Sequence, residues 1–215
     1  MRSPDLNPVR RLFDAVSASA GLVLLLPVFA VLAVAIVLDD GPPVLFRQTR
    51  IGRGGRPFRL WKFRTMRVGS RGRAITAAGD HRVTRVGAAL RKWKLDELPQ
   101  LFNVLVGDMS LVGPRPEVPE FVEPDSPVWD AVLKVRPGIT DLATLFYRSE
   151  ERLLGAARDP VAFYRETVLP AKLRLNLKYM ASRSFAQDLR LIWLSIRYSL
   201  FPAGFDAERI RRSFD

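Results

Sequence analysis

KLDELPQLFNVLVGDMSLVGPRPE, residues 94–117, sets two carboxylates side by side before a proline and ends on a Pro-Arg-Pro and a glutamate. Four apolar residues within it recur at the i, i+3, i+4 and i+7 spacing of an amphipathic helix: Leu98, Leu101, Phe102 and Leu105. Proline is tolerated in the first turn of a helix because the first N–H groups have no partner inside the helix. The stretch therefore predicts a helix after Pro99 that packs on the core and has Asp96 at its N-cap.

The adjacent Asp96 and Glu97 support two interpretations. As an N-cap and a first-turn carboxylate they would stabilise the helix by about 1–2 kcal/mol. As a functional pair they would lie at a helix N-terminus, where phosphates bind, and a carboxylate can act as a nucleophile toward phosphorus. Mg²⁺ also takes one or two carboxylates together with substrate phosphates. Because adjacent helical side chains point about 100° apart, the pair suits two separate roles better than one shared proton.

The Gly113-Pro114-Arg115-Pro116 turn supplies an arginine a short way downstream. The flanking prolines fix the backbone and reduce the entropy that is lost when the guanidinium binds a phosphate. The alternative is a rigid turn whose arginine faces solvent. Phosphoryl transfer needs charge neutralisation by arginine and metal more than it needs proton transfer, so the pair and the arginine together favour a phosphate site.

The composition limits the chemistry. The 215 residues include 34 Lys and Arg against 22 Asp and Glu, a formal net charge of +12, which indicates polyanionic partners such as nucleic acid, anionic lipid or phosphorylated substrates. The chain has no cysteine and one histidine, His81, which excludes thiolate zinc sites, cysteine nucleophiles and histidine metal clusters. Any acid, base or nucleophile is then a carboxylate, a hydroxyl or an amine.

Residues 15–38 carry no charge, and this run is longer than the ~20 residues that a helix needs to cross a membrane. Pro27 lies near its middle, where it bends or breaks a helix. Arginines flank the run on both sides, without the one-sided bias of a spanning helix: Arg2, Arg10 and Arg11 before it, and Arg47, Arg50, Arg53, Arg56 and Arg59 after it. We expect a re-entrant helix-break-helix that enters and leaves by one face, with Pro27 as the membrane break.

Two other arrangements compete with the re-entrant one. An ordinary single-pass anchor with a tolerated proline remains open on these features. A cleaved signal peptide is disfavoured, because the apolar run exceeds the usual 7–15 residues even though Ala33-Val34-Ala35 has the form of a cleavage site.

The segment after the apolar run reads as a β-hairpin followed by a loop and a basic helix. VLFRQTRIG (44–52) and FRLWKFRTM (58–66) are rich in β-branched and aromatic residues and flank a Gly-rich connection. Residues 67–80 are polar and Gly-rich without periodicity, which predicts a mobile loop. From 82 to 94 one helical face is apolar (Val83, Val86, Leu90 and Trp93) and the other is basic (Arg82, Arg85, Arg91, Lys92 and Lys94).

The C-terminal third contains two proline-marked helix starts and an amphipathic helix. Asp159-Pro160 is a cap followed by a first-turn proline, and Pro170 begins or kinks the next helix. SFAQDLRLIWLSIRYSLF (184–201) places one apolar stripe on a helix: Phe185, Leu189, Ile192, Trp193 and Ile196. Its tryptophan, tyrosine and arginines suit a membrane interface, and a buried core helix is the alternative.

Six segments, in order, resemble the bacterial sugar transferases, the monotopic phosphoglycosyl transferases that start glycoconjugate assembly on a polyprenyl phosphate: RRLFD (10–14), VLFRQTRIG, FRLWKFRTM, DHRVTRVG (80–87), KLDELPQLFNVLVGDMSLVGPRPE and VRPGIT (135–140). The resemblance implies that Asp96 attacks the β-phosphate of a UDP-sugar, releases UMP and carries the sugar phosphate covalently until polyprenyl phosphate displaces it. Glu97 would assist the metal or the second nucleophile. Mg²⁺, held by Asp96 and Glu97, would bridge the phosphates.

The resemblance also implies which residues bind substrate and where the protein lies. We expect substrate binding by Lys62, Arg64, Arg91, Pro114, Arg115, Pro116 and Arg136. The expected location is the cytoplasmic face of the bacterial inner membrane, with a monotopic attachment and contact with anionic lipid of the inner leaflet. UDP-sugar and polyprenyl phosphate are the expected partners, nucleic acid is not, and a homodimer is compatible with the sequence. Asp141-Leu142-Ala143-Thr144 replaces the family's frequent Gly-Trp-Ala-Gln, so the sugar is not specified.

The expected architecture is α+β, mainly helical with a small β-hairpin. It comprises a re-entrant membrane hairpin of helices at 10–40, a cytoplasm-facing catalytic domain at 41–205 with a C-terminal interfacial helix, and a polar tail at 206–215.

Two rival functions differ from this one in testable ways. A membrane-anchored basic protein that binds anionic lipid or nucleic acid without catalysis would not need the carboxylate pair, and a glycosyltransferase that moves the sugar alone would release UDP instead of UMP.

Overall fold

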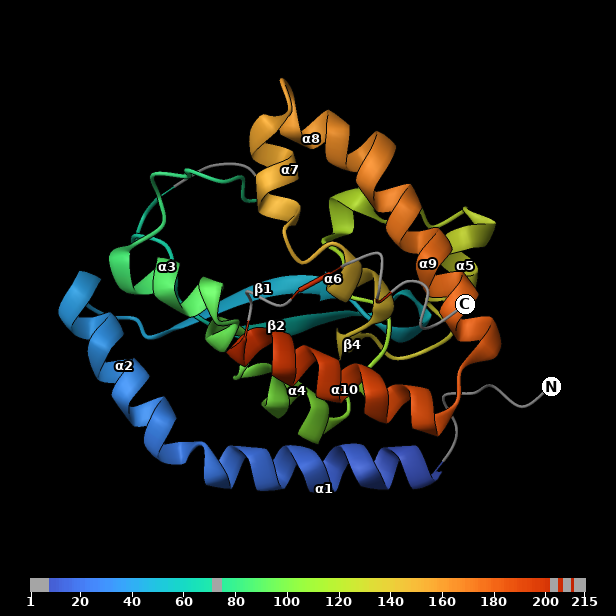
Figure 1. The fold of residues 1–215 in the computed structure, drawn as a ribbon, viewed down its shortest axis with the longest axis horizontal. Helices are drawn as coiled ribbons and strands as arrows, with labels where there is room; N and C mark the ends of the chain where they lie inside the picture. The colour runs from blue at the N-terminus through green and yellow to red at the C-terminus, as the bar shows by residue number, and fades with distance from the viewer. Residues whose placement is uncertain (1–7, 71–74, 202–204, 207–209, 211–215) are drawn as a thin grey trace.

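The computed structural model describes residues 8–70, 75–201, 205, 206 and 210. These residues form a mainly helical α+β fold around a hairpin, as the sequence predicts (Figure 1). The longer helices are α1 (Pro8–Leu24), α2 (Leu26–Asp40), α3 (Arg85–Lys92), α9 (Leu169–Ser182) and α10 (Phe185–Leu200). The shorter ones are α4 (Gln100–Val106), α5 (Pro127–Val132), α6 (Leu142–Phe146), α7 (Glu150–Ala156) and α8 (Pro160–Phe163). The predicted polar tail lies almost wholly outside the described residues.

The apolar N-terminal segment is broken where the sequence predicts it. α1 and α2 meet at Leu25 with a bend of 59°, and Pro27 lies in the first turn of α2. The bend is open, so the two helices run along two sides of the molecule instead of folding back on each other (Figure 1). Within the described part of the chain, no unbroken helix has the length and apolar character of a membrane span, and only this bent pair reaches them jointly.

Polar contacts pin both arms of the bent pair to the rest of the protein. From α1, Arg11 donates to the carbonyl oxygens of Val104 and Leu105 at 2.6 and 2.7 Å, which caps the C-terminal end of α4. Asp14 accepts hydrogen bonds from the Ser110 hydroxyl at 2.7 Å and from the Leu111 N–H.

The end of α2 is held in the same way. Asp39 accepts from the N–H of Val86 in α3 at 2.9 Å. Asp40 is bonded to the Arg64 guanidinium at 2.7 Å, and the same guanidinium also donates to the carbonyl oxygen of Gly41. The apolar segment and the elements that follow it therefore form one connected body.

The predicted β-hairpin is confirmed. β1 (Leu45–Ile51) pairs antiparallel with β2 (Pro57–Phe63), from Leu45↔Phe63 to Ile51↔Pro57, across a short turn that includes Gly54 at φ 67°. Directly opposed residues share a face of the ladder. Gln48, Arg50 and Lys62 consequently project from one face, because Phe46 pairs with Lys62 and the side-chain direction alternates along each strand. The predicted loop at 67–80 contains turns but no helix or strand in its described residues.

A second, parallel pair of strands was not predicted. β3 (Ser110–Val112) pairs with β4 (Gly138–Thr140), and each strand has only three residues, too few to show a periodicity of two. The backbone just after β3, at Gly113, lies very close to the first residue of β4, Gly138. A Cβ on Gly138 would lie 2.1 Å from the Gly113 nitrogen, so this contact requires a residue without a side chain.

Two details of the predicted central helices are wrong. α4 begins at Gln100 with Pro99 in the cap position and no side-chain cap bond, so Asp96 is not its N-cap. Its most buried residues are Gln100, Asn103 and Val104, whereas Phe102 is 45% exposed. Trp93 just beyond α3 is 39% exposed, so it does not complete the predicted apolar face.

The exposure of Phe102 follows from what α4 covers. Asn103 donates to the Arg59 carbonyl oxygen at 2.8 Å and accepts from the Trp61 N–H at 3.0 Å, so its amide closes the open edge of β2. This side of α4 therefore faces the strand, Leu101 and Leu105 lie in the core cluster shared with α1, and Phe102 is left outside.

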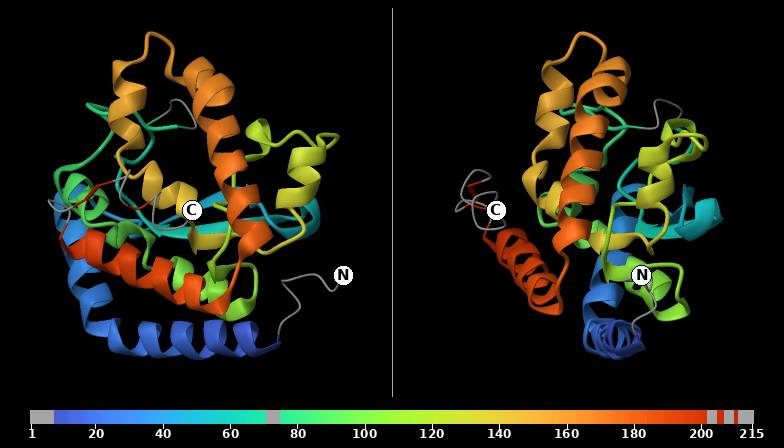
Figure 2. Two further views of the ribbon diagram at one scale, coloured as in Figure 1. Left: turned by 45° about the vertical axis from the view of Figure 1, so that its right-hand side comes forward. Right: turned by 90° about the vertical axis from the view of Figure 1, so that its right-hand side faces the viewer.

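The C-terminal helices follow the predicted starts. Asp159 caps α8 by accepting from the Val161 and Ala162 N–H groups, and Pro170 lies in the first turn of α9. The predicted stripe of α10 is mainly on its exposed side, at Phe185, Leu189, Trp193 and Ile196, while Leu191, Leu194 and Tyr198 are buried. α10 therefore has a core face as well as an exposed apolar face, and the edge contact of Phe13 with Phe185 sets its start beside α1 (Figure 2).

Candidate active site

Asp96 and Glu97 lie in a tight 3₁₀ turn, Leu95–Glu97, between α3 and α4. The residue before it, Lys94, has φ 57°, the left-handed conformation that non-glycine residues seldom adopt. This reversal ends α3 and directs the following carboxylates inward, so that both are buried. Strained backbone of this kind is concentrated at functional sites because the surrounding structure must hold it in place.

Glu97 is held by two cations from different elements. The Arg115 guanidinium grips both carboxylate oxygens, at 2.5 Å to Oε1 and 3.1 Å to Oε2, and Lys62 Nζ lies 3.3 Å from Oε1. Burial alone would raise the pKa of Glu97, but Arg115 and Lys62 hold the pKa well below its usual value. The same ion pair raises the pKa of Arg115 against the opposing effect of burial. With its pKa lowered, Glu97 is held as an anion by these two cations, and it orients two side chains that could bind a phosphate.

Asp96 differs from its neighbour in having a free oxygen. Its side chain is buried, with 6% exposed, and Oδ1 has no hydrogen-bond partner among the described residues. Burial lowers the pKa of Lys62, and the nearby charges of Glu97 and Asp96 oppose this shift. A buried carboxylate oxygen that is held without a partner is poised to receive an electrophile or a cation.

The Pro-Arg-Pro turn is clamped on both sides of its arginine. The Arg115 N–H donates to Asp141 Oδ2 at 2.8 Å, and the Pro116 carbonyl oxygen accepts from Arg50 at 3.1 Å. The Pro114 carbonyl oxygen accepts from the Gly138 N–H at 3.0 Å, next to the close glycine contact. The backbone of Arg115 is therefore fixed before any substrate arrives, as the two prolines predict.

A further set of buried charges surrounds the turn and was missed by sequence reasoning. Glu117 accepts from the Tyr164 hydroxyl at 2.6 Å and lies 3.7 Å from Arg50 and 3.9 Å from Lys172. Lys172 in turn pairs with Glu150 at 2.8 Å. Burial and the charge of Glu117 raise the pKa of Tyr164, and burial lowers the pKa of Arg50.

Only part of this set is marked by a local sequence pattern. Glu117 directly follows the Pro-Arg-Pro, and Arg50 lies within a segment that carries the family resemblance. Tyr164 and Lys172 come from the π-helical turn Tyr164–Val168 and from α9, about fifty residues further along the chain, and no local pattern marks them.

Three residues that were expected to bind substrate make contacts away from the carboxylate pair. Arg64 is tied to the end of α2, as described above. Arg91 donates to Thr65 and Thr76 and pairs with Glu151, so it joins α3 to α7 and the intervening loop. Arg136 donates to the carbonyl oxygen of Gly107. Of the expected set, the structure brings Lys62 and the Pro-Arg-Pro turn to the carboxylate pair.

The residues present fit a magnesium ion in part. Asp96 Oδ1 is available, whereas both oxygens of Glu97 are engaged by Arg115 and Lys62. Among the described residues no group of three or more acidic or imidazole side chains could hold a metal. Mg²⁺ commonly binds through one or two carboxylates together with substrate phosphates and water, so a site based on Asp96 would require the substrate's own oxygens.

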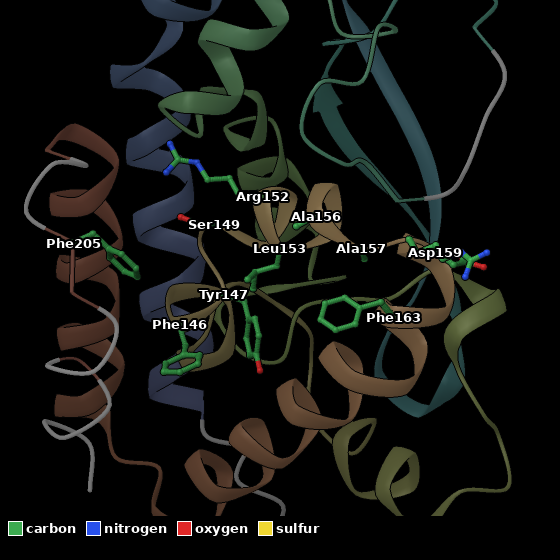
Figure 3. Close-up of a pocket in the computed structure, with 11 residues that line it drawn as sticks. Phe146, Tyr147, Ser149, Arg152, Leu153, Ala156, Ala157, Asp159, Phe163 and Phe205 are labelled. Carbon is green, nitrogen blue, oxygen red and sulfur yellow. The ribbon is translucent and has the colours of Figure 1, made fainter.

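A separate apolar cavity of about 730 Å³ lies among α6, α7 and α8. Figure 3 shows aromatic side chains along it, from Phe146, Tyr147, Phe163 and Phe205, with arginine at its rim. Neither carboxylate of the pair lines it, nor does Arg115. The cavity is thus distinct from the charged site.

Comparison with known proteins gives the family. A family model described as bacterial sugar transferase matches residues 6–202. The UDP-glucose:undecaprenyl-phosphate glucose-1-phosphate transferase of Caulobacter vibrioides is 39% identical over 85% of this chain and 66% of its own length. The UDP-N-acetylgalactosamine-undecaprenyl-phosphate N-acetylgalactosaminephosphotransferase of Aeromonas hydrophila is 43% identical over 95% of this chain and 46% of its own length.

The exopolysaccharide production protein PSS of Rhizobium leguminosarum bv. phaseoli is 37% identical, over 86% of this chain and 92% of its own length. The chain spans about half to two thirds of the length of the Aeromonas and Caulobacter relatives. The match extends from before α1 to the end of α10 and includes the carboxylate pair and the Pro-Arg-Pro turn. These matches confirm the resemblance in the sequence motifs, and the chain belongs to the bacterial sugar transferase family.

Proposed function

We propose that this chain is a phosphoglycosyl transferase that moves a sugar 1-phosphate from a UDP-sugar to a polyprenyl phosphate and so initiates synthesis of a glycoconjugate. The observation that carries the proposal is the contrast within the carboxylate pair. Asp96 has a buried oxygen without a partner, while Glu97 beside it holds two cations. The names of the relatives support the donor and acceptor classes, since they specify UDP-sugars and undecaprenyl phosphate.

In the first step the Asp96 carboxylate attacks the β-phosphorus of the UDP-sugar. A bond forms between Asp96 and that phosphorus, and the bond from phosphorus to the bridging oxygen breaks. UMP leaves with the electron pair, and the sugar phosphate stays on Asp96 as an acyl phosphate. In the second step an oxygen of polyprenyl phosphate attacks the same phosphorus, which restores the carboxylate and yields the polyprenyl diphosphosugar.

The cations around Glu97 stabilise the phosphate charge in both steps. Arg115 presents a planar fork that can hold two phosphate oxygens, and its backbone is already fixed by Asp141 and Arg50. Lys62 adds a second positive charge on the hairpin side. Before substrate binds, Glu97 holds both side chains in place. When a diphosphate enters, Arg115 and Lys62 can turn from Glu97 to the substrate oxygens.

Mg²⁺ bound at Asp96 and, after release from its cations, at Glu97 would neutralise the diphosphate charge. The free Oδ1 of Asp96 supports this assignment, because hard cations take carboxylate oxygens. Arg115 and Lys62 would then orient the remaining phosphate oxygens.

The proposed location is the cytoplasmic face of the bacterial inner membrane, with the bent α1–α2 pair entering and leaving by that face. The exposed apolar residues of α1 and α2 support contact with lipid, as does the exposed stripe of α10. Anionic lipid would complement the net charge of +12.

Replacing the nucleophile gives the first test. Asp96→Asn is expected to reduce UMP release to background and to remove a sugar-phosphate adduct from the intact-protein mass, because an amide is a poor nucleophile toward phosphorus. The matched control is Asp125→Asn at an exposed loop position, which should retain the wild-type rate and adduct. Robust turnover by Asp96→Asn would rule out the covalent mechanism.

The geometry of Arg115 gives a second prediction. Arg115→Lys should lower kcat/KM by about 10- to 100-fold, since an ammonium keeps the charge but loses the paired hydrogen bonds to the phosphate. Steady-state kinetics of UMP release would measure it, with Arg165→Lys at an exposed arginine as the control. Near-normal kinetics for Arg115→Lys would mean that the guanidinium serves the fold alone.

Removing divalent metal should stop both half-reactions. With excess chelator, UMP release and sugar-phosphate transfer are each expected to fall to background, because the diphosphate charge loses its counter-ion, and added Mg²⁺ should restore both. The two steps can be measured separately by omitting polyprenyl phosphate from the first. Undiminished UMP release in chelator would refute the metal requirement.

The orientation in the membrane can be tested in this cysteine-free chain. Ser3→Cys and Ser70→Cys, examined one at a time in membrane vesicles of known orientation, should both react with an impermeant thiol reagent from the cytoplasmic side only. Ser70 marks the catalytic side, so it serves as the reference for Ser3. Labelling of Ser3→Cys from the periplasmic side would establish a spanning segment instead.

A further inference from the structure

Gln100, the first residue of α4, has a side-chain amide that the fold does not use. The residue is 1% exposed, and its Nε2 atom is buried without a hydrogen-bond partner among the described residues. Buried amide donors are nearly always paired, because leaving one without a partner is costly. The free donor of Gln100 therefore requires an explanation.

The free donor lies one turn from the free oxygen of the proposed nucleophile. Asp96 is four residues earlier, and the intervening Leu98 and Pro99 both have right-handed helical backbone. The chain between them is one helical turn of the 3₁₀ type, in which the N–H groups of Leu98, Leu101 and Phe102 bond to carbonyl oxygens three residues back. The 3₁₀ turn and α4 both pack on β2, the strand that carries Lys62. A buried acceptor and a buried donor, each without a partner, thus occur together beside the hairpin.

Within α4, comparison with Asn103 shows that only the Gln100 amide has a buried donor without a partner among the described residues. Asn103 is the other buried amide of α4, and its donor and acceptor are both used: it donates to the Arg59 carbonyl oxygen and to Asp108 and accepts from the Trp61 N–H. One amide on this helix is thus paired with the strand edge. The other has a donor left free, one helical turn after Asp96.

We propose that Gln100 is a further catalytic residue, whose amide donates a hydrogen bond to a non-bridging oxygen of the phosphoryl group that Asp96 attacks. The inference rests on the proposed function and extends it. A phosphoryl group satisfies both atoms at once, because its phosphorus receives the Asp96 oxygen and its oxygen accepts from Gln100. The amide keeps its proton throughout, and no bond to Gln100 forms or breaks.

A neutral donor has a distinct role beside the two cations. Arg115 and Lys62 are bound to Glu97 in this structure, so they must turn to reach a phosphate. The Gln100 donor has no competing partner to leave. A donor that is already oriented toward developing charge stabilises the transition state without reorganisation at the moment of reaction.

The test replaces the amide with a side chain of similar length that cannot donate. Gln100→Met is expected to lower kcat for UMP release about 10²-fold, the usual effect of removing one such donor, with little change in the KM for the UDP-sugar. The unfolding temperature of the variant, measured in the same detergent, should equal or exceed that of the wild type, because the free protein loses no donor bond. A purely structural glutamine would give a lower unfolding temperature.

A second variant and a control keep the result interpretable. In Gln100→Glu, the ratio of variant to wild-type kcat should rise as the pH falls, because only the protonated carboxyl can donate to the phosphate. Asn176→Leu in α9 removes another buried amide with an unpartnered atom, Oδ1, and should retain turnover.

The inference is overturned if Gln100→Met turns over at the wild-type rate, as it would if the amide bound only a water. It is also overturned if the loss of kcat is accompanied by a lower unfolding temperature and Gln100→Glu shows no relative gain at low pH. Failure of the proposed function would look different: the wild type itself would release no UMP from any UDP-sugar with Mg²⁺ and polyprenyl phosphate present.

Discussion

The buried ion pair between Glu97 and Arg115, with Lys62 as the second cation, is the interaction on which the site depends. Each member comes from a different element: the 3₁₀ turn, the Pro-Arg-Pro turn and strand β2. Burying a charge without a partner is costly, and removing one partner of a buried ion pair typically destabilises a protein by about 3–5 kcal/mol. The three elements must therefore meet for any of these charges to be buried, and the free Asp96 carboxylate is buried with them.

The same constraint extends outward to the helical layer. Glu117, one residue beyond the Pro-Arg-Pro, joins Arg50 of the hairpin to Tyr164 and Lys172 of the C-terminal helices. Tyr164 begins a π-helical turn, an irregularity that is frequent near functional sites. Alternating charges thus connect the hairpin, the segment that follows Arg115, and α9.

Local sequence patterns predicted most helices and strands, but they predicted less well which of these elements pack against each other. The hairpin, the break at Pro27 and the cap at Asp159 follow from turn residues and propensities that act within a few positions. Contacts between distant segments decide the rest. Phe102 is exposed because Asn103 on the neighbouring face bonds to β2, and Asp96 is not a cap because the reversal at Lys94 places it in a separate turn.

The site shows the same division. The carboxylate pair and Arg115 could be recognised because they are close in sequence and have a chemical rationale. Lys172 could not, since its burial depends on Glu150 and Glu117, and Asp141 is recognisable as a clamp only once the Arg115 N–H is seen to bond to it. The short parallel strands that bring Gly113 to Gly138 are below the length at which a sequence pattern can be read.

The polar contacts of α1 and α2 join one side of the apolar segment to the packing of the rest of the protein. A chain shortened to begin after Asp40 would lose Asp14, and with it the acceptor for the Ser110 hydroxyl and the Leu111 N–H at the start of β3. It would also uncover the core that Ala18 shares with Leu60, Val104 and Met109. Removing the apolar segment is therefore expected to loosen the packing of β2, α4 and β3, the elements that position the carboxylate pair.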